Sequence, residues 1–475
     1  MPRYAPSGPA RLRAAVAGCV AALVSAPRLS AEPTVAEPVE PAPDVVLILV
    51  DDLGWAELGC YGNRFNETPH ADRLAREGMV FTRAYSPAPV GLPARAALMT
   101  GQAPARLGVL DHRRSDTRWQ VPREMLSLAE LFQTAGYSTG IAGKWQLGGF
   151  ERGRPRSGPG VHGFARRLVA DKRLVGAGSY FHPYTKVDPT LPARDRSPDE
   201  NGSEYLVERV NSEASDFLSG PTVTPRFLFK SHYAVHAELV GKPDAVAHFK
   251  RKAGSGEGQH ATQNNPHLAA MLRSIDDGLG QLLAAIDAAG SWDRTIIVFT
   301  SDNGGDGRYT TNGPLRGAKS QLYEGGLRVP LIVRWPGVTE AGSTSMTPVF
   351  TSDLFATFAE ALSERPSARR PPQPIDAVSL LPVLRGEAPA ARTLAWHYPR
   401  TQPHFLGGRS CDAISDGSWK LIEFHDDGHR ELYHLTDDPG ERNDLSATET
   451  AIVERLADGL ESWRKAMTGD TDGAR

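Results

Sequence analysis

The stretch Asp44-Val45-Val46-Leu47-Ile48-Leu49-Val50-Asp51-Asp52 is a continuous apolar, largely β-branched run that ends in two carboxylates. A run of this kind is typical of a strand buried on both faces of a parallel sheet. Residues 295–300 and 328–335 predict two more strands of the same kind, and apolar spacings of three and four over residues 268–286 predict a helix packed on the sheet. The chain is therefore predicted to be an α/β protein, with a mixed, mainly parallel central sheet sandwiched by helices.

The C-terminal part of the chain follows a different pattern. Residues 419–424 and 431–435 alternate like a half-exposed antiparallel pair, and residues 447–467 predict a final helix, so we expect a small α+β C-terminal subdomain. The stretches predicted to be surface loops are 148–160, 250–265 and 364–374. The predicted organisation is a signal peptide at 1–31, a disordered leader at 32–43, the main α/β domain at 44–385 and the C-terminal antiparallel-sheet subdomain at 386–475.

The N-terminal segment resembles an export signal. Arg3, Arg11 and Arg13 precede or open a short apolar stretch at residues 14–26, which is too short to span a bilayer. We therefore expect an exported protein, either periplasmic or secreted. Lipid attachment at Cys19 is less favoured because almost no apolar run precedes it, and no later segment is long and apolar enough to be transmembrane.

Composition narrows the class of function only slightly. Over 475 residues the formal net charge is −3, which gives no electrostatic case for nucleic-acid binding. Beyond the export signal the chain keeps Cys60 and Cys411, which can either pair or stay free. The sequence leaves the oligomeric state open.

Polar residues follow two of the predicted strands at their carboxyl ends. Asp51 and Asp52 follow the first strand, and Asp302 and Asn303 follow the strand at 295–300. In an open α/β sheet, binding groups gather in the crevice at the carboxyl ends of the strands. Three carboxylates and an amide oxygen in one small volume repel unless a cation joins them, and all-oxygen ligands favour Ca²⁺ or Mg²⁺. These four residues are the predicted metal ligands.

A second informative stretch is Val90-Gly91-Leu92-Pro93-Ala94-Arg95-Ala96-Ala97-Leu98-Met99-Thr100-Gly101. It predicts a helix that begins near Leu92, with Arg95 one turn in and an anion-attracting N-terminus. The stretch also resembles the active-site signature of the sulfatase family, which reads Cys-x-Pro-x-Arg or Ser-x-Pro-x-Arg and continues into a helix ending in Thr-Gly. The resemblance extends in the family's order through Asp51-Asp52-Leu53-Gly54-Trp55, Thr68-Pro69-His70, Gly136-Tyr137-Ser138-Thr139-Gly140-Ile141-Ala142-Gly143-Lys144-Trp145, Ser301-Asp302-Asn303-Gly304-Gly305, Pro314-Leu315-Arg316-Gly317-Ala318-Lys319, Leu432-Tyr433-His434-Leu435 and Asp438-Pro439-Gly440-Glu441-Arg442-Asn443.

The resemblance covers residues from about 44 to 445 and implies an alkaline-phosphatase-like sulfatase fold, a sulfuric ester hydrolase and calcium at the predicted metal ligands, with Mg²⁺ as the alternative. It also implies that Lys144 and Lys319 contact the sulfate and the leaving-group oxygen, and that His236 binds the ester and can protonate the leaving group. A sulfate ester loads charge onto its bridging oxygen as the S–O bond breaks, so fixed cations and a proton donor lower the barrier.

Two positions depart from the family pattern, and both affect its covalent chemistry. In the family the Cys or Ser is oxidised to formylglycine, whose hydrated aldehyde is the nucleophile, but here that position is Gly91, which has no side chain to oxidise. The family histidine that acts on the formylglycine is replaced by Gln146, which cannot serve as a base near neutral pH. We therefore expect no formylglycine and an impaired or inactive sulfatase, with the metal and sulfate-ester pocket retained.

The expected ligand is a sulfated small molecule or a sulfated glycan, and the sequence does not name it. An alternative function is an active metal-dependent hydrolase of sulfate or phosphate esters that uses a nucleophile other than formylglycine. A metal-bound water is the natural substitute because a divalent ion lowers its pKa markedly.

Overall fold

The computed structural model describes most of the chain beyond the N-terminal segment. The described residues are 42–109, 119–148, 150–151, 154–155, 158–169, 180–182, 204–219, 222–253 and 264–469. The predicted signal peptide, the lipid-attachment position Cys19 and most of the predicted leader lie outside these residues.

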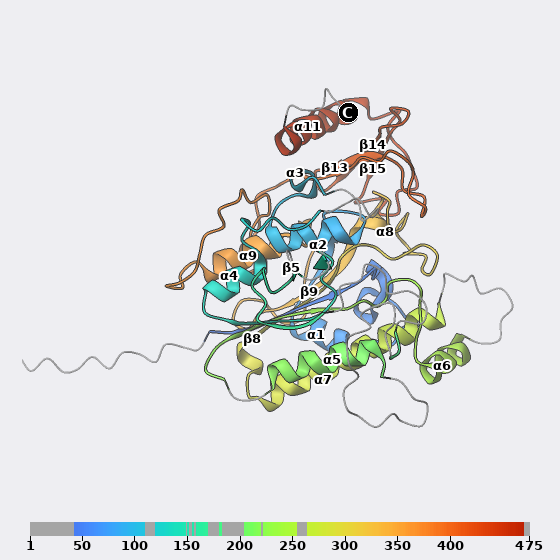
Figure 1. Ribbon diagram of the computed structural model, residues 1–475. Helices are drawn as coiled ribbons and strands as arrows, with labels where there is room; N and C mark the ends of the chain where they lie inside the picture. The colour runs from blue at the N-terminus through green and yellow to red at the C-terminus, as the bar shows by residue number, and fades with distance from the viewer. Residues whose placement is uncertain are drawn as a thin grey trace, which may run out of the picture. The chain divides into compact units, whose positions relative to one another are not determined.

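A nine-stranded sheet runs through the main domain, in the order β10-β2-β9-β8-β1-β7-β3-β6, with β11 also paired to β2 (Figure 1). It confirms the predicted mixed, mainly parallel sheet. Its strands are β1 (Asp44–Val50), β2 (Met79–Tyr85), β3 (Ser138–Gly143), β6 (Arg166–Val169), β7 (Arg226–Ser231), β8 (Thr295–Ser301), β9 (Arg328–Arg334), β10 (Ser343–Ser345) and β11 (Val349–Phe350).

Strand β1 lies near the middle of this sheet and pairs in parallel with β7 and β8. All of its residues are buried, as its continuous apolar sequence predicts. The prediction for residues 328–335 is only partly right, because β9 is buried but runs antiparallel to both β8 and β2. The described chain between β8 and β9 contains only the one-turn helix α8 (Glu324–Leu327), so it turns back at the same end of the sheet instead of crossing over it.

Helices cover both faces of the sheet. The helices α2 (Gly91–Thr100), α4 (Leu128–Thr134) and α9 (Asp353–Leu362) pack on one face, and α1 (Pro69–Glu77), α5 (Leu206–Leu218) and α7 (Pro266–Ala288) pack on the other (Figure 1). Helix α7 confirms the amphipathic helix predicted over residues 268–286, and its buried face includes Leu272, Ile275 and Leu279.

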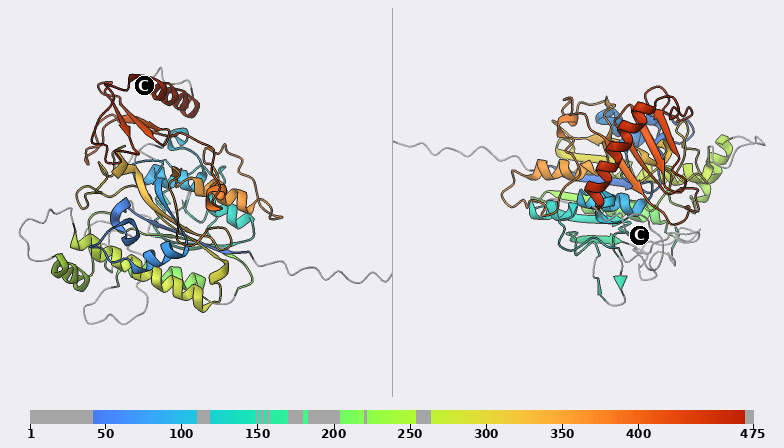
Figure 2. Two further views of the ribbon diagram at one scale, coloured as in Figure 1. Left: turned by 180° about the vertical axis from the view of Figure 1, so that it is seen from behind. Right: turned by 90° about the horizontal axis from the view of Figure 1, so that it is seen from above.

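A separate four-stranded antiparallel sheet follows in the C-terminal region, in the order β12-β13-β14-β15 (Figure 2). One face carries the final helix α11 (Thr450–Thr468), and the other packs through Trp396 and Tyr433 against Tyr85 and Leu327 of the main domain. This confirms the predicted small C-terminal sheet and its helix. Its strands are β12 (Leu394–Tyr398), β13 (Cys411–Ser415), β14 (Trp419–Phe424) and β15 (Arg430–His434).

Two predicted loops contain regular structure. The stretch 148–160 includes a short hairpin, β4 (Phe150–Glu151) with β5 (Arg154–Pro155), and the stretch 250–265 begins inside helix α6 (Pro243–Ala253). The remaining short elements are η1 (Trp55–Glu57), η2 (Gly59–Tyr61), η3 (Trp292–Arg294), α3 (Pro104–Leu107) and α10 (Leu381–Leu384).

Two further observations concern the cysteines and the membrane. Cys60 and Cys411 are both free thiols. Within the described residues, none of the helices combines the length and the apolar character needed to cross a membrane.

Candidate functional site

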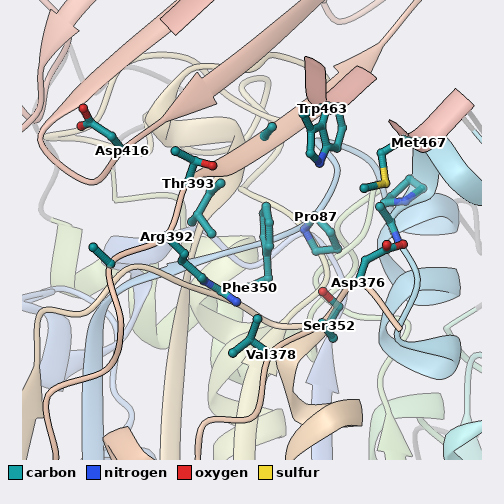
Figure 3. A pocket seen from close by; sticks show the side chains of 16 residues that line it. Pro87, Phe350, Ser352, Asp376, Val378, Arg392, Thr393, Asp416, Trp463 and Met467 are labelled. Carbon is teal, nitrogen blue, oxygen red and sulfur yellow. The ribbon is translucent and has the colours of Figure 1, made fainter. Parts of the chain in front are cut away.

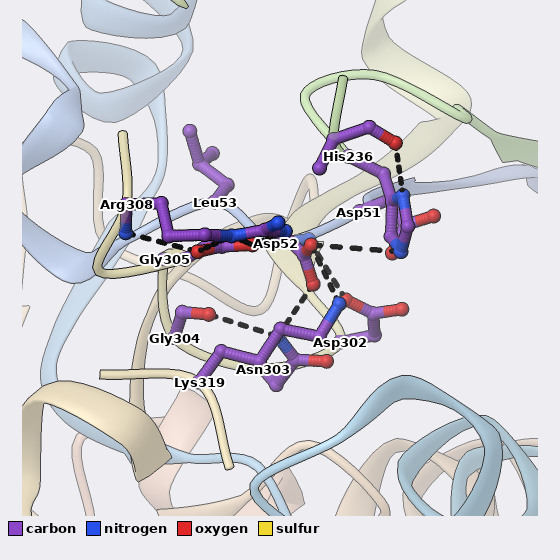
Figure 4. A network of polar contacts seen from close by, with 12 residues as sticks. Asp51, Asp52, Leu53, His236, Asp302, Asn303, Gly304, Gly305, Arg308 and Lys319 are labelled. Carbon is purple, nitrogen blue, oxygen red and sulfur yellow. Dashed lines mark hydrogen bonds and ion pairs between the residues drawn. The ribbon is translucent and has the colours of Figure 1, made fainter. Parts of the chain in front are cut away.

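The carboxyl ends of β1 and β8 bring the four predicted metal ligands together. Val50 lies opposite Ser301 in the parallel ladder, so the residues that follow each strand emerge side by side. The backbone N–H of Asp52 donates to Asp302 Oδ1 at 3.1 Å, and Asn303 Nδ2 donates to Asp52 Oδ1 at 2.8 Å (Figure 4). All four side chains are buried.

Three buried cations face these three carboxylates. Lys144, directly after β3, pairs with Asp51, and Lys319 Nζ lies 2.7 Å from Asp52 Oδ2. Arg95, one turn into α2, places Nε 2.8 Å from Asp302 Oδ2. The formal charges of carboxylates and cations therefore balance, which makes burial of so many ionised groups tolerable.

Burial and neighbouring charge act in opposite directions on the carboxyl groups. Burial is the largest single effect and raises the pKa of Asp51 and Asp52. The neighbouring groups together outweigh it, led by Lys144 at Asp51 and by Lys319 at Asp52, and both pKa values lie below the ordinary value. The pKa of Asp302 is raised, first by burial and then by the charge of Asp51. The pair that follows β1 is therefore the more firmly ionised, as cation ligands must be.

His236 lies at the edge of this cluster, in the loop after β7. Its Nε2 is 3.8 Å from Asp52 Oδ2, and its Nδ1 is 2.8 Å from the carbonyl oxygen of Ala237. Since a carbonyl oxygen only accepts, Nδ1 carries the proton, and Nε2 of the neutral ring faces the site as an acceptor. Burial, and then the charge of Lys319, lower the pKa of His236, which favours the neutral ring.

The donor set fits a hard divalent cation. Asp51 Oδ1 and Asn303 Oδ1 are buried and have no hydrogen-bond partner among the described residues, so both oxygens are available as ligands. Single ligand atoms of Asp51, Asp52 and His236 lie within 4.8 Å of one another. Carboxylate and amide oxygens suit Ca²⁺ or Mg²⁺. His236, whose nitrogen lies close to these oxygens, was not among the predicted metal ligands.

Gly91 and Gln146, the two positions that depart from the family pattern, meet at the same place. Gly91 is the first residue of α2, one position earlier than predicted. A Cβ at this position would lie 2.7 Å from Asp302 Oδ2 and 3.5 Å from Gln146 Oε1. The Gln146 oxygen is buried without a hydrogen-bond partner among the described residues, and its backbone is left-handed, with φ of 64°. A side chain at position 91 would thus point into the carboxylate cluster.

Two polar residues, one in the site and one at its border, escaped sequence reasoning. Ser231, the last residue of β7, accepts from Arg95 Nη1 at 2.7 Å and fixes the guanidinium. Arg308 lies beside Asp52 and Gly305 (Figure 4), held by Asp306 through Nη2–Oδ2 at 2.6 Å. Its only sequence signal is its place five residues after Asn303, which says nothing of the direction of its side chain.

A cavity of about 580 Å³ lies elsewhere, between the main domain and helix α11 (Figure 3). Phe350, Val378, Trp463 and Met467 form much of its wall. None of the ten predicted site residues belongs to its described lining, so this cavity is separate from the candidate site.

Comparisons with known proteins identify relatives of similar sequence and fold. A solved structure named Ps i-CgsB, in complex with k-i-k-neocarrahexaose, matches with a TM-score of 0.75 and 27% identity, over 89% of this chain and 93% of that one. Steryl-sulfatase of Rattus norvegicus is 31% identical over 81% of this chain and 77% of its own length. N-acetylgalactosamine-6-sulfatase of Homo sapiens is 31% identical over 87% of this chain and 84% of its own.

Family models match nearly the whole described chain. The model described as N-sulphoglucosamine sulphohydrolase, C-terminal, matches residues 318–466. The model described as Sulfatase matches residues 43–364, a range that contains every predicted site residue. The family model, the similar sequences and the similar structure agree, and the chain belongs to the sulfatase family.

Proposed function

We propose that this chain is an exported sulfatase-family protein that binds a divalent cation, Ca²⁺ or alternatively Mg²⁺, together with a sulfated ligand. It does not turn over sulfuric esters in the ordinary way. The cation ligands are Asp51, Asp52, Asp302 and Asn303, and the residues that contact the sulfate ester are Arg95, Lys144, His236 and Lys319.

The proposal depends mainly on which residues surround position 91. A side chain there would contact Asp302 and face Gln146, in the middle of the charged cluster, yet Gly91 supplies no nucleophile and Gln146 no base. Every charged group around that point is present. Loss of the covalent step with retention of the binding groups explains this pattern better than general decay of the site would.

The balance of charge supports anion binding. Three carboxylates and three cations cancel, so a divalent cation at the free oxygens of Asp51 and Asn303 would leave the site positively charged. The N-terminus of α2, which begins at Gly91, adds a partial positive charge beside Arg95. When bound, the cation would supply further attraction for a sulfate ester, while this chain's lysines and Arg95 orient it.

The names of relatives support the class of ligand. One is a steryl-sulfatase, one is an N-acetylgalactosamine-6-sulfatase, and a structural neighbour is described in complex with neocarrahexaose. We propose a sulfated glycan or a sulfated small molecule for this chain.

Two assays on the purified protein test the proposal. Calorimetry with Ca²⁺ and a sulfated glycan panel should detect binding, which Lys319→Met abolishes. 4-Nitrophenyl sulfate should not be hydrolysed above the buffer rate, because no covalent nucleophile is present. Turnover of this ester that depends on metal and disappears in Asp302→Asn would contradict the proposal. Hydrolysis of 4-nitrophenyl phosphate that chelator removes would favour the alternative, a hydrolase without formylglycine.

A further inference from the structure

Arg308 is a positioned cation at the border of the candidate site. Its guanidinium is held by the buried carboxylate of Asp306, with Nε at 3.1 Å from Oδ1 and Nη2 at 2.6 Å from Oδ2. The side chain is nevertheless 47% exposed, so one side of the guanidinium is open to solvent. The pKa of Arg308 is raised, chiefly by its hydrogen bonds to Asp306 and least by the charge of Asp52.

Two aromatic rings flank this guanidinium. The Arg308 Cζ atom lies 5.2 Å from the ring centroid of Tyr309 and 5.5 Å from that of Phe405. Phe405 is 62% exposed, which is unusual for a side chain of this size in the described part of the molecule. An exposed ring beside a fixed cation offers a flat apolar face on which a ligand ring can stack.

Phe405 reaches this position from the C-terminal subdomain. It lies on a tight turn in which the His404 N–H donates to the Gly408 carbonyl at 2.7 Å. A Cβ on Gly408 would lie 1.8 Å from the carbonyl oxygen of Ser320, so the turn rests directly on the backbone next to Lys319. The ring is therefore fixed relative to the lysine that faces Asp52.

The surface beyond Tyr309 is polar. A cavity of about 490 Å³ adjoins this residue, and its lining includes the amide side chains of Asn63, Asn66 and Asn312 and the cations Arg64 and Lys252. The three amides are hydrogen-bonded within the protein, to Ala56, Glu57 and Gly305. The cations and the polar character of the lining suit a ligand that carries hydroxyl and sulfate groups better than an apolar one.

We propose that Arg308, Tyr309 and Phe405 form a saccharide subsite beside the sulfate pocket. The subsite takes the sugar ring next to the sulfated one, with the ring stacked on Phe405 and an acidic group paired with Arg308. The ligand is therefore a sulfated oligosaccharide, which continues past Tyr309 towards the polar cavity. This inference rests on the proposed function, because it assumes that the sulfate pocket binds a ligand.

Calorimetry on the full chain with Ca²⁺ tests the subsite. The probes are tetrasaccharides from chondroitin sulfate, heparin and carrageenan, with 4-nitrophenyl sulfate as an ester that carries no sugar. Arg308→Gln and Phe405→Ala should each weaken binding of the preferred tetrasaccharide about tenfold. Both variants should bind 4-nitrophenyl sulfate as the wild type does, since that ester does not reach the subsite.

Matched controls come from elsewhere on the surface. Arg73 also pairs with a carboxylate, Glu77 at 2.8 Å, and lies over an aromatic ring, that of Trp292 at 4.7 Å. That ring precedes β8, at the opposite end of the strands from the site. Met346 is 72% exposed and serves as the apolar control. Arg73→Gln and Met346→Ala should leave tetrasaccharide binding unchanged.

The outcomes separate the two proposals. Tetrasaccharide binding that Lys319→Met abolishes but that Arg308→Gln and Phe405→Ala leave intact would overturn the subsite and keep the proposed function. Equal losses for the tetrasaccharide and for 4-nitrophenyl sulfate would also overturn it, because Arg308 would then act on the sulfate pocket itself. If the wild type binds none of the probes, both proposals fail.

Discussion

Two buried clusters of charge in this molecule both pair carboxylates with lysine, but they differ in whether every oxygen has a partner. In the first, at the carboxyl ends of β1 and β8, Asp51 Oδ1 and Asn303 Oδ1 have no hydrogen-bond partner among the described residues. In the second, Lys420 of β14 joins Glu324 of α8 to Glu441 at 3.0 and 2.9 Å.

In the second cluster every carboxylate oxygen lies within hydrogen-bond or ion-pair distance of a donor. Glu441 Oε1 accepts no hydrogen bond from the described residues but lies 2.9 Å from Lys420 Nζ as an ion pair. Glu324 Oε2 accepts from Tyr85 at 2.9 Å, and Glu441 Oε2 accepts from the Glu324 N–H at 2.7 Å, while Lys420 takes the other two oxygens. All three charged side chains are completely buried. A saturated cluster fixes the C-terminal sheet to the main domain, whereas unpartnered oxygens in the first cluster indicate a place for a ligand.

The largest expected effect is a gain of chemistry in the first cluster. Gly91→Cys, co-expressed with the formylglycine-generating enzyme, should show the formylglycine mass shift and slow or single-turnover sulfate release. Adding Gln146→His should raise turnover by about 10²–10⁴-fold, since it restores the base. The two effects should be strongly non-additive, because Gln146→His alone has no nucleophile to act on.

The steric contact at position 91 calls for a control. A Cβ there meets Asp302 at 2.7 Å, so Asp302 must shift in any such variant. Gly91→Ala combined with Gln146→His has the same contact without a nucleophile, and it should release no sulfate. If the Cys and His variant carries both formylglycine and calcium yet cleaves no sulfate ester, then Lys144, His236 and Lys319 do not form a sulfate site.

Removal of a lysine should distinguish the clusters by stability. Lys420→Met leaves the buried Glu441 without its cation and leaves Glu324 with Arg328 alone, at 3.6 Å. It should lower the free energy of unfolding by about 3–5 kcal/mol in urea denaturation. With Ca²⁺ present, Lys319→Met should lower the free energy of unfolding less than Lys420→Met does, because the proposed cation compensates the charge of Asp52. Equal losses for the two variants in Ca²⁺ would show that the first cluster is as purely structural as the second.

Added Ca²⁺ should stabilise the folded protein by binding at the first cluster and not at the second. At a Ca²⁺ concentration of 100 times the dissociation constant, the free energy of unfolding should rise by about 2.7 kcal/mol, measured against the protein in chelator. Asp51→Asn should abolish most of this rise. Glu324→Gln, in the saturated cluster, should keep it whatever its own effect on stability, and a loss of the rise there would contradict the comparison.

The smallest effect concerns pH. Burial, together with the charge of Glu324, outweighs Lys420 and raises the pKa of Glu441 to about 7. The folded state then holds a proton that the unfolded state has lost, so stability should fall as pH rises from the ordinary carboxyl value towards 7. Glu441→Gln should reduce the slope of the unfolding free energy against pH by the amount that corresponds to about one bound proton at most. The exposed Asp437→Asn should leave it unchanged in denaturation at several pH values.

Much of the fold follows from local patterns in the sequence. The apolar run at 45–50 predicted a strand buried on both faces, and the spacing at 268–286 predicted α7. The direction of β9 could not be predicted, because direction depends on whether the preceding loop crosses the sheet and not on the strand's own residues. The hairpin of β4 and β5 was missed because Gly and Pro in that stretch conceal its pairing.

The site divides in a similar way. The sequence could predict that residues following a strand, such as Asp52 and Asp302, lie close together, because parallel neighbouring strands end at the same edge of the sheet. The Lys144 and Lys319 partners came only from the family resemblance. Arg308 was missed because its role depends on a ring from a distant segment, Phe405, and no local pattern encodes that meeting.

The contact between Gly408 and the backbone of Ser320 also bears on modularity. It joins a turn of the C-terminal subdomain, without any intervening side chain, to the loop that carries Lys319. We therefore expect a fragment that ends at residue 385 not to keep an intact site, because it lacks the turn that packs against the loop carrying Lys319. A C-terminal unit grafted from another protein would likewise need a glycine where Gly408 contacts Ser320. The two parts of the chain are therefore expected to be exchanged only together.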